Sequence, residues 1–245
     1  MTVSTAMVLA AGLGTRMRPL TDNRPKALVE VGGCALIDHV LDRLIGAGVQ
    51  RAVVNVHHFA DAMEAHLARR RDIEIVISDE RALLMETGGG VKQARALLGD
   101  APVLVANIDS VWEEPDGPAA ARLAASFDAS RMGALLMLAS MDACLGFDGK
   151  GDFHRNGDGR IAFRGEDPSA DWAYMGVQVI DPAILDPEPL EPFSFARVWR
   201  RLQGQGRLYG APLGGFWMHV GDPHALAAAE TRLAETHSEK IAAGQ

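Results

Sequence analysis

The first half of the chain alternates between short apolar runs and segments whose apolar residues recur at helical spacing. The apolar runs span residues 6–11, 51–56, 73–77 and 102–106, and continuous hydrophobicity of this length is typical of strands buried on both faces of a parallel sheet. The helical segments are 36–45, 60–69 and 91–98, the last preceded by a glycine loop at 88–90. This alternation predicts a doubly wound, mostly parallel α/β sheet with right-handed crossovers.

The second half is less regular. Further strands are predicted at 134–138, 175–180 and 216–220, and residues 153–163 read as an antiparallel hairpin that turns at 156–159. The alanine-rich stretch 223–236 predicts a last helix, and the proline-punctuated stretch 182–192 a loop inside the domain. Because no linker or repeat interrupts the pattern, we expect a single domain over 1–236 and a frayed tail over 237–245.

Composition narrows the class of protein. The 245 residues are 48% hydrophobic and carry a formal net charge of −8, which argues against a general nucleic-acid surface. The N-terminal apolar run stops at Gly12, too short for a signal peptide or a membrane span. The two cysteines, Cys34 and Cys144, are isolated from one another, as in a reducing compartment. We therefore expect a cytoplasmic protein with no nucleic-acid or membrane partner.

Positive charge gathers directly after the first strand, although the chain as a whole is acidic. The cations Arg16, Arg18, Arg24 and Lys26 follow the sequence "LAAGLG". In an open parallel sheet, ligands bind at the carboxyl ends of the strands, where glycines let backbone N–H groups approach an anion. The stretch predicts a phosphate-binding loop.

Two other interpretations of the glycines compete. A Rossmann dinucleotide site needs a third glycine where Met17 stands, and an acidic residue where Asn55 to His58 end the second strand. A plain structural turn explains a lone Gly-x-Gly as well as a site does. The cations favour the phosphate interpretation.

Several separated motifs resemble, in order, those of the sugar-1-phosphate nucleotidyltransferases. They are "LAAGLGTRMRPLT", "RPKALVEVGG", "VVNVHHFADAMEAHL", "METGGGVKQA", "NID", "GKGDF" and "WMHVGDPHAL", and they span nearly the whole chain. The short length and the "ETGGG" and "GDF" elements look most like the branch that uridylylates N-acetylmuramate α-1-phosphate. The resemblance implies a Rossmann-like nucleotidyltransferase fold with a small antiparallel hairpin region. It also implies that a sugar 1-phosphate attacks the α-phosphorus of a nucleoside triphosphate, with Mg²⁺, or Mn²⁺ in its place, as cofactor.

The same resemblance assigns roles to residues. Arg16 reaches the departing pyrophosphate, Lys26 contacts phosphates near the reacting centre, and Asp109 holds the metal, so these three form the catalytic group. Asp152, Glu166 and Gly176 are assigned to the sugar. The nucleotide is assigned to Leu9, Ala10, Ala11, Gly12, Gly14, Thr15, Arg16, Lys26, Glu86, Gly88, Gly89 and Asn107.

The "ETGGG" stretch has two interpretations. It is either a helix N-terminus capped by Thr87, or a place where Gly88 and Gly89 let a pyrimidine ring approach the backbone. Three glycines exceed what a cap needs, so we favour the second, and with it UTP. Guanylyl transfer of the mannose-1-phosphate type, or a homologue that binds nucleotide without catalysis, are the alternatives.

One motif departs from the family pattern. Relatives show Trp-x-Asp-Val-Gly, whose aspartate joins the metal, whereas this chain has "WMHVG" with His219 in that place. Asp222, three residues later, is the alternative ligand. However, it directly precedes Pro223 and the last helix, which is typical of an N-cap followed by proline at the first helical position. We therefore assign the metal to Asp109 and His219. We also expect Lys26 to be exposed, so that its removal spares the fold.

Overall fold

The computed structural model describes residues 3–242, with side chains as far as Thr236. Within this range the main sheet has nine strands, in the order β11-β10-β12-β6-β1-β4-β5, and β8 and β13 continue it from β12. Its centre is parallel, as predicted: β1 (Thr5–Leu9) lies between β6 (Val103–Asn107) and β4 (Arg51–Val56), and β5 (Glu74–Asp79) forms the edge.

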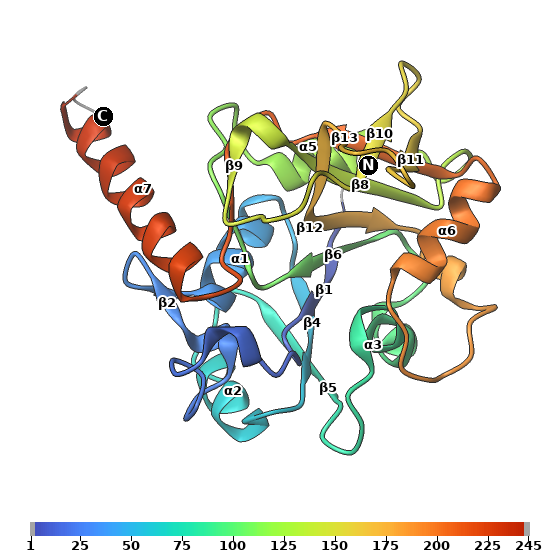
Figure 1. Ribbon diagram of the computed structural model, residues 1–245. Coiled ribbons are helices and arrows are strands. Elements are labelled where there is room, and N and C mark those ends of the chain that lie inside the picture. Colours follow the sequence, from blue (N-terminus) through green and yellow to red (C-terminus); the bar gives the residue numbers. More distant parts are fainter. Residues whose placement is uncertain (1–2, 243–245) are drawn as a thin grey trace.

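Helices cover both faces of this parallel centre (Figure 1). The helices α1 (Leu36–Gly46) and α2 (Ala60–Leu67) lie on one face, and α3 (Glu86–Gln93) and α6 (Ala196–Gly204) on the other. Side chains of β1 alternate accordingly, since Ala6 and Val8 belong to one apolar core and Met7 to the other. The doubly wound α/β prediction is confirmed.

The second half adds antiparallel strands. β12 (Trp172–Ile180) pairs antiparallel with β6, and it joins the parallel centre to β8 (Ala134–Ser140) and to β13 (Leu208–Pro212) beyond it. The predicted hairpin is present as β10 (Phe153–Arg155) and β11 (Ile161–Phe163). Two small sheets complete the fold: β7 (Ser110–Trp112), β14 (Trp217–His219) and β9 (Cys144–Leu145), and β2 (Glu30–Val31) with β3 (Cys34–Ala35).

Four details differ from the sequence-based expectation. Glycines 88–90 lie inside α3 rather than in a loop, and a short helix α4 (Arg95–Leu98) follows it. The stretch 182–192 contains a 3-10 turn, Pro182–Leu185. The helix α5 (Ala119–Ser126) and α6 were not predicted. The last helix, α7 (Pro223–Ala242), continues beyond residue 236, while positions 243–245 of the predicted tail lie outside the described residues.

No helix between residues 3 and 242 combines the length and the hydrophobicity needed to cross a membrane.

Candidate active site

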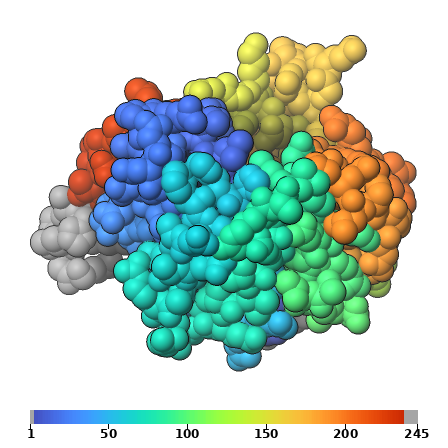
Figure 2. All heavy atoms as spheres, turned by 90° about the horizontal axis from the view of Figure 1, so that it is seen from below, coloured from blue at the N-terminus to red at the C-terminus, as the bar shows by residue number. Residues whose placement is uncertain are grey.

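A cleft of about 290 Å³ lies at the carboxyl ends of β1, β4 and β6, the edge where an open parallel sheet binds ligands. Figure 2 shows the molecule from the end to which the loops after β4 and β5 extend. In this view the N-terminal residues, in blue, lie beside the residues that follow them along the chain, in cyan and green. The lining of the cleft comes from six separate stretches of the chain: Leu9, Ala11, Gly12, Gly14, Thr15 and Arg16; Lys26; Asn55; Leu84, Glu86 and Thr87; Asn107, Ile108 and Asp109; and Gly221.

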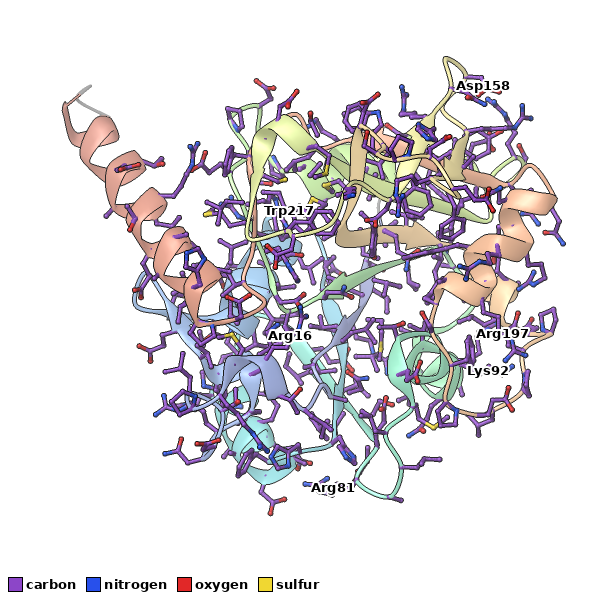
Figure 3. The ribbon with its side chains drawn as sticks, viewed as in Figure 1. Arg16, Arg81, Lys92, Asp158, Arg197 and Trp217 are labelled. Atoms are coloured by element: carbon purple, nitrogen blue, oxygen red, sulfur yellow. The ribbon has the colours of Figure 1, made fainter. Side chains whose placement is uncertain are left out.

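The loop after β1 is held in shape by its neighbours. The N–H groups of Ala10 and Ala11 donate to Oδ1 of Asn55, at 2.7 and 3.2 Å. Gly14 has φ 63°, and a Cβ there would lie 2.9 Å from Cβ of Lys26, so only glycine fits without strain. Arg16, labelled in Figure 3, follows on the 3-10 turn Thr15–Met17 and is exposed. The loop thus presents backbone and one arginine to the cleft.

The charged centre of the cleft is a cluster of three side chains. Nζ of Lys26 lies 2.9 Å from Oδ2 of Asp109, and Nε2 of His219 lies 3.5 Å from the same oxygen. Burial by itself raises the pKa of Asp109, but the His219 imidazole and the Lys26 ammonium outweigh it, so that this pKa lies below its ordinary value. Asp109 is therefore a carboxylate at neutral pH.

Lys26 is 8% exposed, so the expectation of an exposed lysine was wrong. The 3-10 turn Lys26–Leu28 places the stem of this side chain against Gly14 and its ammonium on Asp109, which is distant in sequence. A buried cation must be paired, and Asp109 provides the pair.

His219 reaches Asp109 because β14 pairs with β7, with His219 opposite Ser110. Its Nδ1 lies 3.0 Å from the carbonyl oxygen of Gly146. Since a carbonyl oxygen only accepts, Nδ1 carries a proton, and Nε2 is the ring nitrogen that faces Asp109. A carboxylate and an imidazole are both side chains that divalent cations accept as ligands. Within residues 3–242, no group of three or more His, Cys, Asp or Glu is arranged to hold a metal.

Asp222 is the N-cap of α7, as predicted. Its Oδ1 accepts from the N–H of Ala225 at 2.9 Å, and the helix begins at Pro223. Its neighbour Gly221 lines the cleft, whereas the Asp222 carboxylate serves the helix.

Gly88 and Gly89 do not line the cleft. Their N–H groups donate to the carbonyl of Phe193, at 2.8 and 3.0 Å, and a Cβ on either would collide with Phe193 or with the backbone of Glu191. This close approach gives the two glycines a packing reason that requires no ligand, and their assignment to the nucleotide stays a prediction. Thr87 is not a cap either, because its Oγ1 accepts from the N–H of Phe195.

The three residues assigned to the sugar lie outside the cleft lining. Asp152 accepts from the N–H of Tyr174 at 2.9 Å, and burial raises the pKa of this carboxyl. Gly176, with φ 90°, lies in the irregular part of β12 against Asn107, and Glu166 is exposed.

Sequence reasoning missed several lining residues, Asn55 and Thr87 among them. Asn55 had a signal, since it ends the second strand where a dinucleotide site would carry an acid.

Comparisons with known proteins agree with this geometry. A family model described as nucleotidyl transferase matches residues 5–147. The chain is 56% identical over 235 residues to N-acetylmuramate alpha-1-phosphate uridylyltransferase of Caulobacter vibrioides, covering 94% of this chain and 97% of that protein. It is 36% identical over 222 residues to the protein of the same name from Neisseria meningitidis, covering 88% and 92%.

Among solved structures, the inositol-1-phosphate CTP transferase of T. maritima shares the fold. The TM-score is 0.79 at 18% identity, over 94% of this chain and 95% of that one. Family model, relatives and fold agree, and the chain belongs to the nucleotidyl transferase family.

Proposed function

We propose that this protein transfers UMP from UTP to a sugar 1-phosphate, N-acetylmuramate α-1-phosphate, and releases pyrophosphate. The observation that carries the proposal is the cluster of Lys26, Asp109 and His219 beside the glycine loop, with Lys26 and Asp109 lining the cleft and His219 in contact with Asp109. The 56% identical relative bears the name of this activity.

The reaction needs charge and positioning more than a base. An oxygen of the sugar phosphate forms a bond to the α-phosphorus of UTP, and the bond from that phosphorus to the bridging oxygen of pyrophosphate breaks. The attacking oxygen is already anionic, so no proton has to be removed. Backbone groups of the loop from Leu9 to Gly14 hold the nucleotide, while Lys26 and Arg16 neutralise charge on the phosphates.

We assign a divalent cation, Mg²⁺ or Mn²⁺, to Asp109 and His219. When bound, it would offset negative charge on the phosphates. An imidazole is softer than a carboxylate and contributes no negative charge, so this pair favours Mn²⁺ more than two carboxylates would. Nζ of Lys26 donates to Oδ2 of Asp109 and so holds the carboxylate in place before the substrates bind.

The acceptor is assigned to the region beside the cleft where Gly176 of β12 packs against the lining residue Asn107 and Asp152 accepts from the N–H of Tyr174. Glu166 is the third residue assigned to the sugar; it is exposed and, like the other two, lies outside the lining.

A screen of pyrophosphate release tests the proposal. UTP, GTP, CTP and ATP are each combined with N-acetylmuramate α-1-phosphate, glucose 1-phosphate and mannose 1-phosphate, with Asp109→Asn as the inactive control. We expect UTP with N-acetylmuramate α-1-phosphate to give the highest kcat/KM. A preference for GTP with mannose 1-phosphate would assign guanylyl transfer instead, and nucleotide binding without any turnover would identify a non-catalytic homologue.

A further inference from the structure

The nucleotide side of the cleft has two walls from separate parts of the chain. One is the loop from Leu9 to Arg16, and the other is the segment from Leu84 to Thr87 at the start of α3. Between them lies Asn55, at the carboxyl end of β4, which is 2% exposed. Behind Asn55 lies Glu80, 1% exposed, immediately after β5. Neither side chain has a role in the transfer chemistry.

These two side chains connect the walls by an unbroken set of hydrogen bonds. Oδ1 of Asn55 accepts from the N–H groups of Ala10 and Ala11. Nδ2 of Asn55 donates to Oε1 of Glu80 at 2.7 Å, and Oε2 of Glu80 accepts from the N–H of Met85 at 3.0 Å. The amide orientation is fixed by its partners, since the oxygen faces two donors and the nitrogen faces a carboxylate.

The second wall is held from both sides. The carbonyl of Met85 accepts from the N–H of Phe193, opposite its contact with Glu80. Glu86, which lines the cleft, has φ 60°, a conformation that a residue with a Cβ adopts only when its surroundings impose it. In addition, a Cβ on Gly90 would lie 2.8 Å from Oε1 of Glu80 and 2.9 Å from Nδ2 of Asn55. The helix α3 is therefore packed directly onto the pair.

We propose that Asn55 and Glu80 are positioning residues that fix the separation of the two walls and thereby set nucleotide affinity and base selection. A buried carboxylate is costly to desolvate, and here each oxygen of Glu80 accepts a hydrogen bond, one from Asn55 and one from Met85. These two contacts set the width of the slot, by which we mean the space between the two walls. The inference rests on the proposed use of UTP by this cleft. It differs from that proposal because it concerns the residues that shape the slot and not the reaction.

The test begins with Glu80→Gln. The side chain keeps its shape, but it offers one acceptor and one N–H donor where two donors, Nδ2 of Asn55 and the N–H of Met85, require acceptors. We expect the Kd for UTP, measured by calorimetry, and the KM for UTP to rise about tenfold or more, with kcat and the KM for the sugar phosphate changed less than about threefold. The ratio of Kd for GTP to Kd for UTP should fall, because the slot no longer excludes the wrong base.

The double variant Asn55→Asp with Glu80→Gln provides the rescue. The aspartate accepts from Ala10, Ala11 and the new amide, and the glutamine oxygen accepts from Met85, so every hydrogen bond is restored with the roles exchanged. Most of the lost affinity for UTP should return in the double variant. Asn55→Asp alone places the new carboxylate against that of Glu80, and its affinity for UTP should be as impaired as that of Glu80→Gln.

Glu188→Gln is the matched control. Glu188 is 8% exposed and pairs with Arg197 and Arg201, away from the cleft, near the labelled Arg197 in Figure 3. The Glu188→Gln variant should have a lower Tm and an unchanged Kd for UTP.

The proposal is overturned if Glu80→Gln behaves like Glu188→Gln, losing Tm while the UTP affinity and the GTP-to-UTP ratio stay at the wild-type values. It is also overturned if the double variant folds but recovers no affinity. Failure of the proposed function would be seen in the wild-type protein, which would then prefer a nucleotide other than UTP. The same variants would then be measured with that nucleotide.

Discussion

The two sides of the cleft are built by different means. The nucleotide side presents backbone, namely the loop from Leu9 to Gly14 and the start of α3, held in place by the buried pair of Asn55 and Glu80. The other side, which we call the charged side, presents the side chains of Lys26, Asp109 and His219 from three separate stretches of the chain. On the first side a substitution acts through shape, and on the second through charge. The two sides should therefore respond differently to the removal of a charge and to the addition of a methyl group.

The largest effect is expected on the charged side, for Lys26→Ala. Loss of a cation that stabilises the phosphates should lower kcat/KM by roughly 10²–10³. Because Lys26 is buried against Asp109, we now also expect a loss of stability of about 1–3 kcal/mol from the unpaired carboxylate. Pyrophosphate release and thermal unfolding measure the two effects.

Lys92→Ala is the control for this prediction. Lys92 lies on α3, donates to the carbonyl of Leu185 and does not line the cleft. Figure 3 labels Lys92 and Arg16 in different parts of the molecule. Near wild-type kcat/KM in Lys26→Ala would contradict the assignment of this lysine to the phosphates.

The next effect concerns His219. His219→Ala should weaken Mg²⁺ binding and activity by roughly tenfold, because Asp109 then lacks its nitrogen partner. His219→Asp should restore activity with Mg²⁺ and reduce the relative advantage of Mn²⁺, since a second carboxylate replaces the softer imidazole. Calorimetric titration of each metal in the presence of UTP, alongside activity, makes the measurement. Equal metal affinities in the wild-type protein and His219→Ala would remove His219 from the metal site.

The parallel centre was predictable because its strands are buried on both faces, and their apolar runs are visible in sequence, as in β4 (Arg51–Val56), whose bounds were predicted correctly. The glycine loop was predictable because cations follow it. The burial of Lys26 was not, since it depends on Asp109, a residue far along the chain. The same holds for Gly88, Gly89 and Gly90, whose partners are Phe193, Glu191 and Glu80. Sequence indicated that three glycines needed a reason but not which contact supplied it.

A methyl group on the nucleotide side tests the role of shape. Gly90→Ala places a Cβ against Glu80 and Asn55, which should cost about 1–3 kcal/mol of stability and weaken UTP binding without changing any charge. Gly46→Ala at the end of α1 is the matched control, because a Cβ there meets nothing within 4 Å. It should be neutral or stabilising by about 0.4–1 kcal/mol. Urea unfolding and UTP calorimetry on both variants decide the matter, and equal results for the two would show that α3 tolerates displacement from the pair.

The smallest effect is expected for Asp222→Ala, beside the charged side but outside its chemistry. The Asp222 carboxylate accepts from the N–H of Ala225, and its loss should lower the free energy of unfolding by about 1 kcal/mol, which is about 2–4 °C in Tm for a chain of this length.

Asp222→Asn separates the cap from metal binding, because asparagine caps a helix about as well as aspartate but is a poor ligand for Mg²⁺. The hydrogen bond from Ala225 lowers the pKa of Asp222 below its ordinary 3.8. A lowered folded-state pKa means that the cap contributes fully above pH 3.8 and that its contribution is lost as the pH falls through the folded value. The difference in stability between the wild-type protein and Asp222→Ala should therefore shrink in acid. The difference between Asp222→Asn and Asp222→Ala should not change with pH, because asparagine does not titrate. If instead both Asp222 variants keep their Tm and lose activity and Mg²⁺ affinity, then Asp222 is the ligand, and His219 belongs to the packing around it.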